Sequence, residues 1–440
     1  MSDRTDMRSP GHARTDPPGG RGRSLLATAG IWVGAALLLA VLPHLFSSGL
    51  ALTSMSLVGM MIIFALSYNM LLGQTGLLSF GQAVFFGLGG FLTAHAMNAL
   101  ADGKAAVPLV VVPLVGAAAG LVFGILFGAV ATRRAGTAFA MITLGIGELV
   151  LSSALILRRI FGGEEGITTN RTDLLPLFGM TFGPQIQVYY LIAAWCLVST
   201  AAMYALTRTP FGRICNAVRD NPQRAAFIGY DTRAVRFIAY SLSGLFAGVA
   251  GALAAINFEI VNAEQLGAAQ SGSVILMAYI GGVGNFAGPI IGAIVVTYLQ
   301  VGLSDVTEIW QLYFGLLFIG MVMFAPDGIA GLLARQQPLL QGRRLHRVVP
   351  FYLLSLLPGL AALAGLSLAI EMTNRLTARA ADGPDMTFLY MPIRADSPLP
   401  WLIAVVLMAG GGWLFLRAAR LTRQAYDEAL AAARSPGSGT

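Results

Sequence analysis

The sequence predicts an all-α, polytopic helical membrane protein with about ten core transmembrane helices and a C-terminal two-helix extension. Only 11% of the 440 residues are charged, whereas soluble globular domains have about 25%, and the mean hydropathy is +0.72. The chain also has 53 glycines, and small residues allow membrane helices to pack closely. These figures exclude an ordinary soluble enzyme, and they exclude disorder over most of the length.

Apolar stretches that are long enough to cross a membrane follow one another along the chain. A span needs about 20 residues, because about 30 Å of hydrocarbon is crossed at about 1.5 Å per residue. A core domain, residues 25–335, is expected to contain spans at 25–46, 50–72, 83–100, 107–131, 137–160, 188–207, 235–257, 268–284, 286–303 and 309–325. A C-terminal extension, residues 336–440, is expected to contain two more, at 350–370 and 400–417.

The first residues have a different composition. Residues 1–24 are rich in Arg, Gly, Pro, Ser and Asp, which is typical of a disordered tail. A cleaved signal peptide is the alternative for this end. The apolar run 25–42 is too long for the core of such a peptide and no Ala-x-Ala site follows it, so we expect an uncleaved first span.

The basic residues predict the orientation. If the N-terminus is cytoplasmic, the cytoplasmic segments hold 21 of the 28 basic residues and the outer segments hold 7. Because cytoplasmic loops are enriched in Lys and Arg, we expect both termini on the cytoplasmic side. The outer segments hold 12 of the 21 acids, which favours either an ordinary solvated face or a surface for a partner.

Several kinds of chemistry are not expected. Lys104 is the only lysine, and it is followed by Ala105, whereas a P-loop needs Ser or Thr there. If the chain takes part in ATP-driven work, another chain must hydrolyse the ATP. The two cysteines and four scattered histidines give no basis for a disulfide or a metal site. We therefore expect no catalytic residues and no cofactor.

One charged residue, Glu148, lies deep in an expected span. An intramembrane carboxylate costs about 3 kcal/mol and is by default a functional hypothesis. The neighbouring Gly145 and Gly147 would allow close helix contact, so a structural bridge between helices is an equally good alternative. A proton-coupled carrier usually needs more than one such group, which argues against that class.

Two apolar segments are interrupted by glycines and carry polar residues. The first, residues 69–82, contains Asn69, Gln74, Thr75, Ser79 and Gln82, and the second, residues 281–289, contains Asn285. Broken helices in matched halves of a chain indicate a transport path, so these residues and Glu148 are candidates for its lining. Helix packing is the alternative for each glycine. A packing ridge is expected at Gly120, Gly124 and Gly128.

The longest polar stretch between core spans on the cytoplasmic side is the loop 207–236. It carries six arginines, and Asn221-Pro222 is a helix-start signal that predicts a short helix over 222–229, ending near Gly229. Such a helix is what a membrane subunit would present to a soluble motor. An anchor that touches only lipid headgroups is the alternative.

Seven blocks of sequence, in order, resemble the LivM-type branched-chain amino acid ABC transporter permease family. They include SYNMLLGQTGLLSFGQAVFFGLGGF at 67–91, TPFGR at 209–213 and ILMAYIGGVGNFAGPIIGA at 275–293. The resemblance covers about residues 50–335 and departs at 336–440, for which the sequence suggests no function. It implies a multi-pass permease of the bacterial inner membrane, with residues 25–335 as the permease domain.

The same resemblance implies partners and a coupling site. The partners are a LivH-like second permease, two cytoplasmic ABC ATPases, a periplasmic binding protein and the lipid bilayer, and no nucleic acid. The helix that couples to the ATPase maps to Arg219, Asp220, Asn221, Arg224, Ala225, Ala226 and Gly229. The older importer signature, Glu-Ala-Ala and then three residues before Gly, is not met, since only two residues separate Ala226 from Gly229.

The function that this resemblance implies is translocation of branched-chain or related neutral amino acids by an ATP-driven importer. A permease for urea or short amides is an alternative. An ATP-independent channel or secondary carrier is compatible with Glu148 and the broken segments, although not with the coupling loop. An intramembrane enzyme lacks any paired acid and base or metal cluster in the expected spans.

Overall fold

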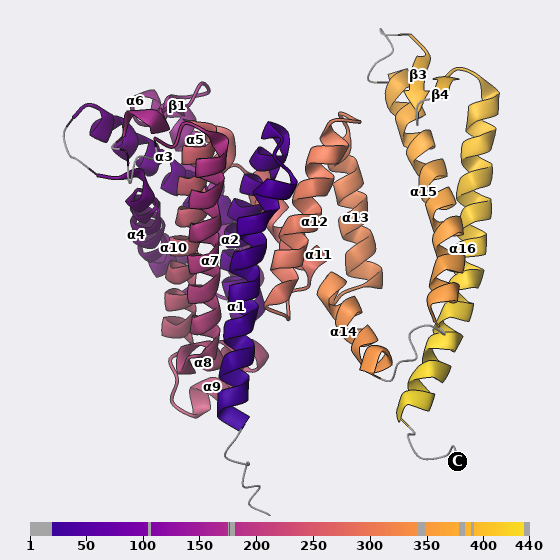
Figure 1. The fold of residues 1–440 in the computed structure, drawn as a ribbon, viewed down its shortest axis with the longest axis horizontal. Helices are drawn as coiled ribbons and strands as arrows, with labels where there is room; N and C mark the ends of the chain where they lie inside the picture. The colour runs from indigo at the N-terminus through magenta and orange to yellow at the C-terminus, as the bar shows by residue number, and fades with distance from the viewer. Residues whose placement is uncertain are drawn as a thin grey trace, which may run out of the picture. The chain divides into compact units, whose positions relative to one another are not determined.

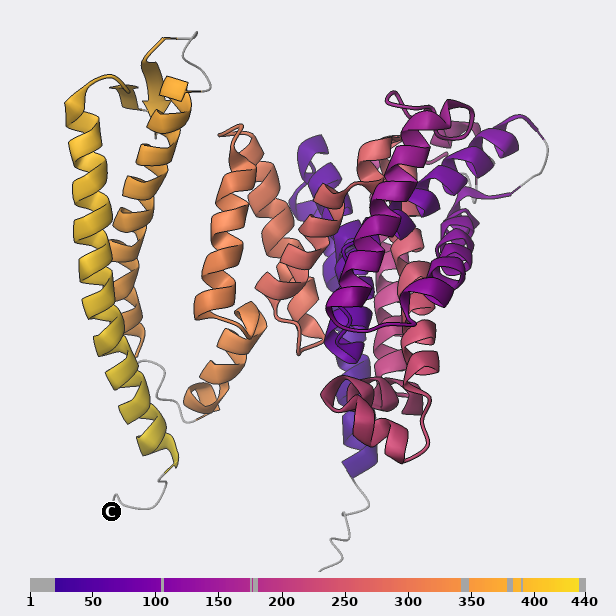
Figure 2. The ribbon, with the colours of Figure 1, turned by 180° about the vertical axis from the view of Figure 1, so that it is seen from behind.

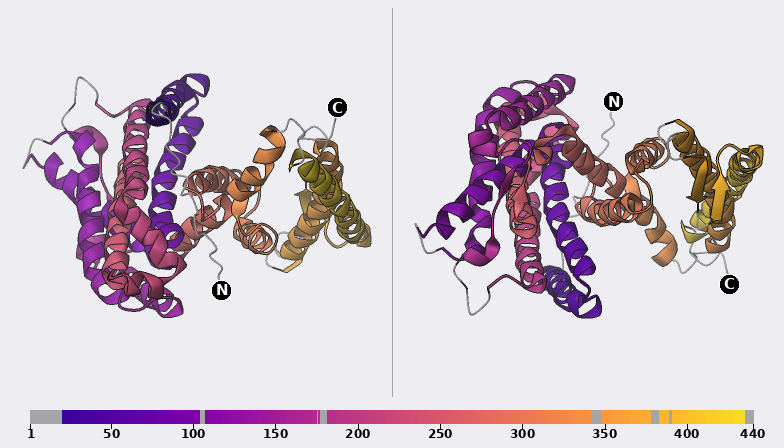
Figure 3. Two further views of the ribbon diagram at one scale, coloured as in Figure 1. Left: turned by 90° about the horizontal axis from the view of Figure 1, so that it is seen from below. Right: turned by 90° about the horizontal axis from the view of Figure 1, so that it is seen from above.

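The computed structural model describes residues 20–103, 107–174, 176, 181–341, 348–377, 383–388 and 391–434 (Figure 1, Figure 2 and Figure 3). The chain divides after Gly331 into two compact units. Each unit is described by itself.

The first unit is a bundle of helices. It contains α1 (Gly20–Leu45), α2 (Gly49–Thr75), α3 (Gln82–Ala101), η1 (Leu109–Val111), α4 (Pro113–Ala131), α5 (Thr137–Ile156), α6 (Arg158–Phe161), β1 (Ile167–Thr168), η2 (Arg171–Asp173), α7 (Gln185–Arg208), α8 (Pro210–Asp220), α9 (Pro222–Phe227), α10 (Thr232–Phe258), β2 (Ile260–Val261), η3 (Ala263–Leu266), α11 (Ala268–Gly281), α12 (Ala287–Ser304) and α13 (Trp310–Phe324). Helix α14 (Gly328–Gln341) begins in this unit and continues into the second.

The predicted class, an all-α polytopic membrane protein, is confirmed. Among the described residues, nine helices are long and apolar enough to cross a membrane, or ten if the bent pair α13 and α14 forms one span. The apolar helices Ala29–Leu45 and Ala268–Gly281 are shorter. Each of the twelve predicted spans therefore falls on a helix. Three of them do not count as full spans by themselves: the apolar part of α1, α11, and α13 unless it is joined to α14.

The start of α1 and the end of α5 differ from the predicted boundaries. Helix α1 begins at Gly20, inside the predicted disordered tail 1–24, of which residues 1–19 lie outside the described part of the chain. Helix α5 ends at Ile156, four residues before the predicted boundary, and α6 follows it as a separate turn. Helix α1 thus begins in polar sequence, since residues 20–24 are Gly, Arg, Gly, Arg and Ser, and α5 ends before Arg158 and Arg159, which the predicted span included.

Helix α10 forms the centre of the first unit, where it contacts α2, α3 and α4. The expected packing ridge on α4 is confirmed: a side chain at Gly120 would clash with the carbonyl oxygen of Gly244 on α10, and one at Gly124 would meet Ser241. On the α10 side, a side chain at Gly248 would clash with the backbone of Gly116. Glycines thus allow α4 and α10 to approach until their backbones touch.

The end of the first unit opposite α8 and α9 is closed by a small sheet (Figure 1). Strands β1 and β2 pair antiparallel, with Ile167 opposite Val261. Arg171 is held there by its guanidinium, which donates to the carbonyl oxygens of Phe182 at 2.9 Å and Asn257 at 3.1 Å. These bonds join the end of α10 to the loop before α7.

The second unit contains a helical hairpin. It consists of α15 (Val349–Thr377), β3 (Asp385–Phe388), β4 (Met391–Arg394) and α16 (Pro398–Arg434). The helices run antiparallel, because a side chain at Gly365 would clash with Ala404 and Met408, and Thr422 donates to the carbonyl oxygen of Phe351 at 3.1 Å. Strands β3 and β4 pair antiparallel between them.

Candidate functional site

The first glycine-interrupted segment is a break between α2 and α3. Helix α2 ends at Gly76, which adopts the left-handed conformation, with φ 69°, that glycine tolerates. The chain then turns back along α2, and α3 begins at Gln82 beside Ser67, about two turns before the end of α2. The N-terminus of α3 is therefore inside the bundle rather than at its end.

The side chain of Gln82 ties three helices together. Its Nε2 donates to Ser243 Oγ on α10 at 2.8 Å and to Ser67 Oγ on α2 at 3.3 Å. Ser243 Oγ in turn donates to the carbonyl oxygen of Ser67 at 2.7 Å. Gln82 Oε1 has no hydrogen-bond partner among the described residues. All three side chains are fully buried, so this is a polar network enclosed by apolar helices.

Two more helices contribute hydroxyl groups to the same place. The amide of Phe80 donates to Thr143 Oγ1 on α5 at 3.2 Å, and the amide of Ala83 donates to Ser271 Oγ on α11 at 3.1 Å. Ser271 lies in the first turn of α11, so the N-termini of α3 and α11 meet here. We call this group the polar cluster; it consists of Ser67, Ser79, Gln82, Thr143, Ser243 and Ser271.

The predicted path residues divide between this cluster and other places. Ser79 and Gln82 belong to the polar cluster. Asn69 and Thr75 are buried farther along α2, where Thr75 donates to the carbonyl oxygen of Leu71 at 2.7 Å, and Gln74 is partly exposed. Asn285 is exposed in the turn between α11 and α12, and its side chain accepts from the amide of Ala287 at 3.4 Å.

Glu148 is exposed on α5, and its side chain does not point into the bundle. The preceding Gly147 stands against Gly81, because a side chain at Gly147 would lie 3.8 Å from the Gly81 Cα. A side chain at Gly81 would clash with the carbonyl oxygen of Thr143. Helix α5 thus packs on the break through one face and carries Glu148 on another.

The loop between α7 and α10 folds into two helices, α8 and α9. The sequence predicts only the second, and its start is confirmed: Asn221 caps α9 by accepting from the amide of Arg224 at 2.9 Å. Helix α8 has its own cap at Thr209 followed by Pro210, a start signal that resembles the one at Asn221-Pro222. The chain turns after α9 near Gly229, which has φ 94°.

Large apolar side chains project from the end of α9. Phe227 is 90% exposed and Ile228 is 68% exposed. Of the predicted coupling residues, Asn221, Arg224, Ala226 and Gly229 are also exposed, whereas Ala225 is buried against the apolar residues of α8 and α10. An exposed apolar pair at the tip of a polar loop is a feature of protein interfaces.

Arg219 and Asp220 lie at the end of α8 and form an ion pair, with Arg219 Nη2 2.9 Å from Asp220 Oδ1. The guanidinium of Arg219 also donates to the carbonyl oxygen of Gly73 on α2. A side chain at Gly76 would meet the aliphatic part of Arg219. Arg219 therefore connects the α8–α9 loop to the end of α2, immediately before the break.

Cys215 packs inside the same loop. It is 1% exposed and lies in an apolar cluster with Val218, Ala225, Val235 and Ala239. Burial raises the pKa of the Cys215 thiol to about 12. The loop thus has a small core of its own, which holds α8 and α9 against the start of α10.

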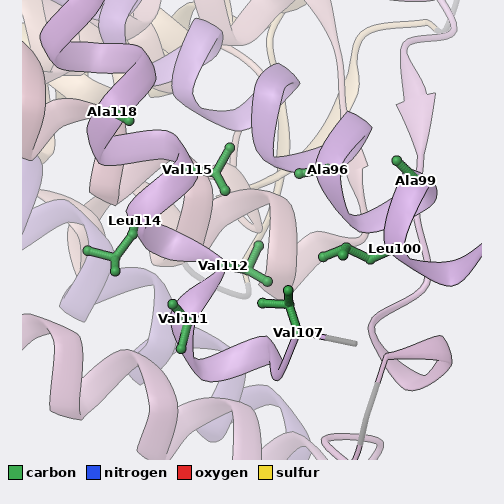
Figure 4. Close-up of a pocket in the computed structure, with 9 residues that line it drawn as sticks. All are labelled: Ala96, Ala99, Leu100, Val107, Val111, Val112, Leu114, Val115 and Ala118. Carbon is green, nitrogen blue, oxygen red and sulfur yellow. The ribbon is translucent and has the colours of Figure 1, made fainter. Parts of the chain in front are cut away.

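A cavity of about 580 Å³ lies between α3, η1 and α4 (Figure 4). Its lining is Ala96, Ala99, Leu100, Val107, Val111, Val112, Leu114, Val115 and Ala118. These side chains offer no group that would bind the ammonium or carboxylate of an amino acid. In the described part of the chain, no group of three or more His, Cys, Asp or Glu residues could hold a metal ion.

Several residues of these sites were not predicted from the sequence. They are Ser67, Thr143, Ser243 and Ser271 in the polar cluster, and Phe227 and Ile228 at the tip of α9. Single hydroxyl residues are common in membrane helices, where they also bond to their own backbone, so they give little signal. Phe227 and Ile228, by contrast, are apolar residues in a polar loop, which is a detectable signal.

Comparisons with known proteins agree on one family. The profile described as "Branched-chain amino acid transport system / permease component" matches residues 50–326. The chain is 28% identical, over 302 residues, to the high-affinity branched-chain amino acid transport system permease protein LivM of Escherichia coli, covering 64% of this chain and 70% of that protein. It is 27% identical over 304 residues to LivM of Salmonella typhimurium, with the same shares of 64% and 70%.

A relative that is named for a different cargo also matches. The chain is 27% identical over 176 residues to the fructose import permease protein FrcC of Rhizobium meliloti, covering 37% of this chain and 47% of that protein. No solved structure matches the chain at a significant level.

Proposed function

This chain belongs to the family of branched-chain amino acid transport system permease components, and from this premise we propose that it is the membrane-spanning subunit of an ATP-driven importer. The observation that carries the proposal is the α8–α9 loop. It has its own core, it presents Phe227 and Ile228 at its tip, and it contacts α2 through Arg219. A loop with these contacts can transmit a movement of a soluble motor to the helix bundle.

The proposed motor is a pair of ABC ATPase subunits, each of which binds one permease chain. Phe227 and Ile228 enter a groove of the ATPase, and Arg224 lies beside them. The matched relatives are permease components, and Lys104 is not part of a P-loop, so ATP hydrolysis is assigned to the separate subunits. A LivH-like second permease and a periplasmic binding protein complete the proposed assembly.

The proposed mechanism starts at the α8–α9 loop and ends at the break. When the ATPases close, the loop moves, and the Arg219 contact with Gly73 moves the end of α2 with it. The break at 76–81 absorbs this movement, because its residues lie between the two helices and only the amides of Gly76 and Leu77 bond back to the end of α2. The positions of α3 and α5 at the polar cluster then change. Thr143 on α5 accepts a hydrogen bond from the amide of Phe80 in the break, and Gln82, which follows the break, donates to Ser243 on α10.

The proposed cargo is a branched-chain or related neutral amino acid. This follows the names of the LivM relatives, whereas FrcC is named for fructose, so the fold alone does not determine the cargo. Urea or a short amide is the alternative cargo. The identity of the binding protein that delivers the cargo decides between them.

We also propose the location and domains. The chain crosses the bacterial inner membrane with both termini in the cytoplasm, because that orientation puts 21 of 28 basic residues inside. The α8–α9 loop is then cytoplasmic and the β1–β2 sheet periplasmic. Residues 25–335 are the permease domain, and residues 336–440, beyond the family match, are an extension with two spans.

The test is uptake into proteoliposomes that contain both permeases, both ATPases and the binding protein. We expect leucine uptake with ATP and none with a non-hydrolysable ATP analogue. Uptake that is indifferent to ATP would contradict the proposal and favour a channel or secondary carrier. Uptake of urea in place of leucine, with ATP still required, would leave the importer assignment intact and replace the cargo.

A further inference from the structure

Helix α5 has an exposed face that differs from those of its neighbours. Thr137, Met141, Gly145, Glu148 and Ser152 are all exposed, and their spacing of three or four residues places them on one side of the helix. We call this side the Glu148 face. Helix α5 stands at the front of the bundle in Figure 2. In its most apolar stretch of 18 residues, 33% of the residues are buried, against 78% in the corresponding stretch of α10.

The chemistry of the Glu148 face does not suit lipid. An ionised carboxylate in hydrocarbon is strongly unfavourable, and charged residues in spans normally face protein or water. The exposed face of α4 provides the contrast, since its large exposed side chains are all aliphatic, at Leu114, Val122, Ile125, Leu126 and Val130. Helix α5 also exposes aliphatic side chains, such as Leu149 at 63%, so the difference between the two helices is the carboxylate, since α4 contains no charged residue.

The Glu148 face is also open to close approach by another helix. A side chain at Gly145 would have nothing within 4 Å. A glycine one turn from a polar residue is the pattern that allows a second helix to pack closely and to satisfy the polar group. The Glu148 face is therefore suited to pack against a membrane-spanning helix, so its partner is another transmembrane chain.

The position of this face relates it to transport. Through Thr143 and Gly147, α5 packs on the break at 76–81, and Glu148 follows Gly147 on another side of the same helix, five residues after Thr143 of the polar cluster. The polar cluster is buried, and the cavity at α3 and α4 has an apolar lining. A zwitterionic cargo such as an amino acid needs a wetted path with polar walls, and a second chain that covers the Glu148 face would complete such a path.

We propose that the Glu148 face is turned toward the second permease chain, and that Glu148 lines the water-filled path between the two chains. Its carboxylate attracts the ammonium group of an amino acid in transit. The inference rests on the proposed function, because it takes the partner permease and the amino acid cargo from it. It adds the surface that pairs, the helix that forms the wall and a residue that contacts the cargo.

Cross-linking in the complete complex tests the surface. A photo-reactive amino acid is placed at Met141 or Ser152 on the Glu148 face, and at Val122 on α4 as the matched control. We expect cross-links to the second permease from Met141 and Ser152, and none from Val122. Cross-links from Val122, or lipid adducts alone from both positions on α5, would overturn the proposed surface.

Measurements of water access and of transport test the proposed role of Glu148. In the variant Glu148→Cys, a charged thiol reagent is expected to react in the assembled complex, whereas Val122→Cys stays unreactive; Cys196 and Cys215 are buried and set the background. Glu148→Gln is expected to lower the maximal uptake rate about tenfold while the complex assembles normally, and Glu148→Asp to retain most of the rate. Unchanged uptake by Glu148→Gln, or an unreactive Glu148→Cys, would contradict the role in the path.

The two proposals fail in different ways. ATP dependence is measured first with the unchanged chain, and its absence contradicts the importer assignment whatever α5 does. If uptake requires ATP but the cross-links run through another face, only the inference about α5 is wrong.

Discussion

The guanidinium of Arg219 donates a hydrogen bond to the backbone carbonyl oxygen of Gly73, 146 residues earlier in the chain. Gly73 lies in the last turn of α2, and Gly76 ends that helix beside the aliphatic part of the same arginine. The residue expected from the sequence to face the ATPase thus faces the bundle as well. Its contact joins the α8–α9 loop to the break.

We expect Arg219→Ala to uncouple the motor from the path without releasing the motor. A hydrogen bond to a charged group contributes about 1.5–3 kcal/mol, so ATP-dependent uptake should fall about tenfold or more while the ATPases remain bound. Uptake and ATPase co-purification are measured on the same proteoliposomes. Arg213→Ala, an exposed arginine on the same helix, is the control and should transport normally. Loss of ATPase binding in Arg219→Ala would instead place this arginine in the docking surface.

The opposite result is expected for Phe227 and Ile228. Exposed apolar anchors at an interface commonly contribute 2 kcal/mol or more, so the double change to Ser should weaken ATPase binding by about thirtyfold. Affinity is measured with the permease pair in nanodiscs and the purified ATPase. Val306→Ser serves as the control, because Val306 is 82% exposed in the loop after α12, at the other end of the first unit. Equal weakening by the control would show that Phe227 and Ile228 have no specific role in binding the ATPase.

Most of the fold follows from the sequence because spans are defined by a local quantity, the length of an apolar run. All twelve predicted spans fall on helices for this reason. Gly120, Gly124 and Gly128 could be assigned to packing because their spacing fixes one face of a helix, whatever the partner is. Helix caps such as Asn221 are equally local signals.

The polar cluster could not be predicted, since it depends on which distant segments meet. Gln82 and Ser243 are 161 residues apart, and neither segment contains a pattern that identifies the other as its partner. Glu148 is an intermediate case: the sequence marks it as unusual, but only the structure shows that it points out of the bundle. The direction of Arg219 is likewise a tertiary property.

Gln82→Leu is expected to destabilise the bundle moderately. It removes the bonds to Ser67 and Ser243, and interhelical hydrogen bonds in membranes contribute about 0.6–1.7 kcal/mol. Thermal unfolding of the purified chain in detergent should show a clear drop in Tm, and Gln311→Leu, on an exposed position of α13, should show none. An unchanged Tm would mean that the polar cluster does not hold α2, α3 and α10 together.

Gly248→Ala is expected to disrupt the contact between α4 and α10. The added methyl group would clash with the backbone of Gly116 and Gly120, which cannot rotate away, so we expect a loss of about 1–3 kcal/mol in the free energy of unfolding. Gly302→Ala is the matched control, since a side chain there has nothing within 4 Å and alanine favours a helix. Denaturation of both variants in the same detergent measures the difference. Equal stability would contradict the backbone contact.

Cys215 provides a test of the core of the α8–α9 loop. Burial raises its pKa from 9.0 to about 12, so the folded loop keeps the thiol neutral where an exposed thiol ionises. Below pH 9 the thiol is neutral in both folded and unfolded chains, and its contribution to stability is fully present. As the pH rises from about 9 to 12 the unfolded chain loses this proton first, so that contribution is progressively lost.

The corresponding measurement is maleimide labelling of a Cys196→Ala chain, in which Cys215 is the remaining thiol. Because maleimide reacts with the exposed thiolate, we expect no labelling of the folded chain between pH 7 and pH 9, and rapid labelling in denaturant. Ala226→Cys, made with both native cysteines changed to Ala, is the comparison; this exposed position should label at pH 7 and faster at pH 9. If Cys215 instead labels in step with the comparison, α8 and α9 open readily, and a loop that opens cannot transmit the force that the Arg219 contact requires.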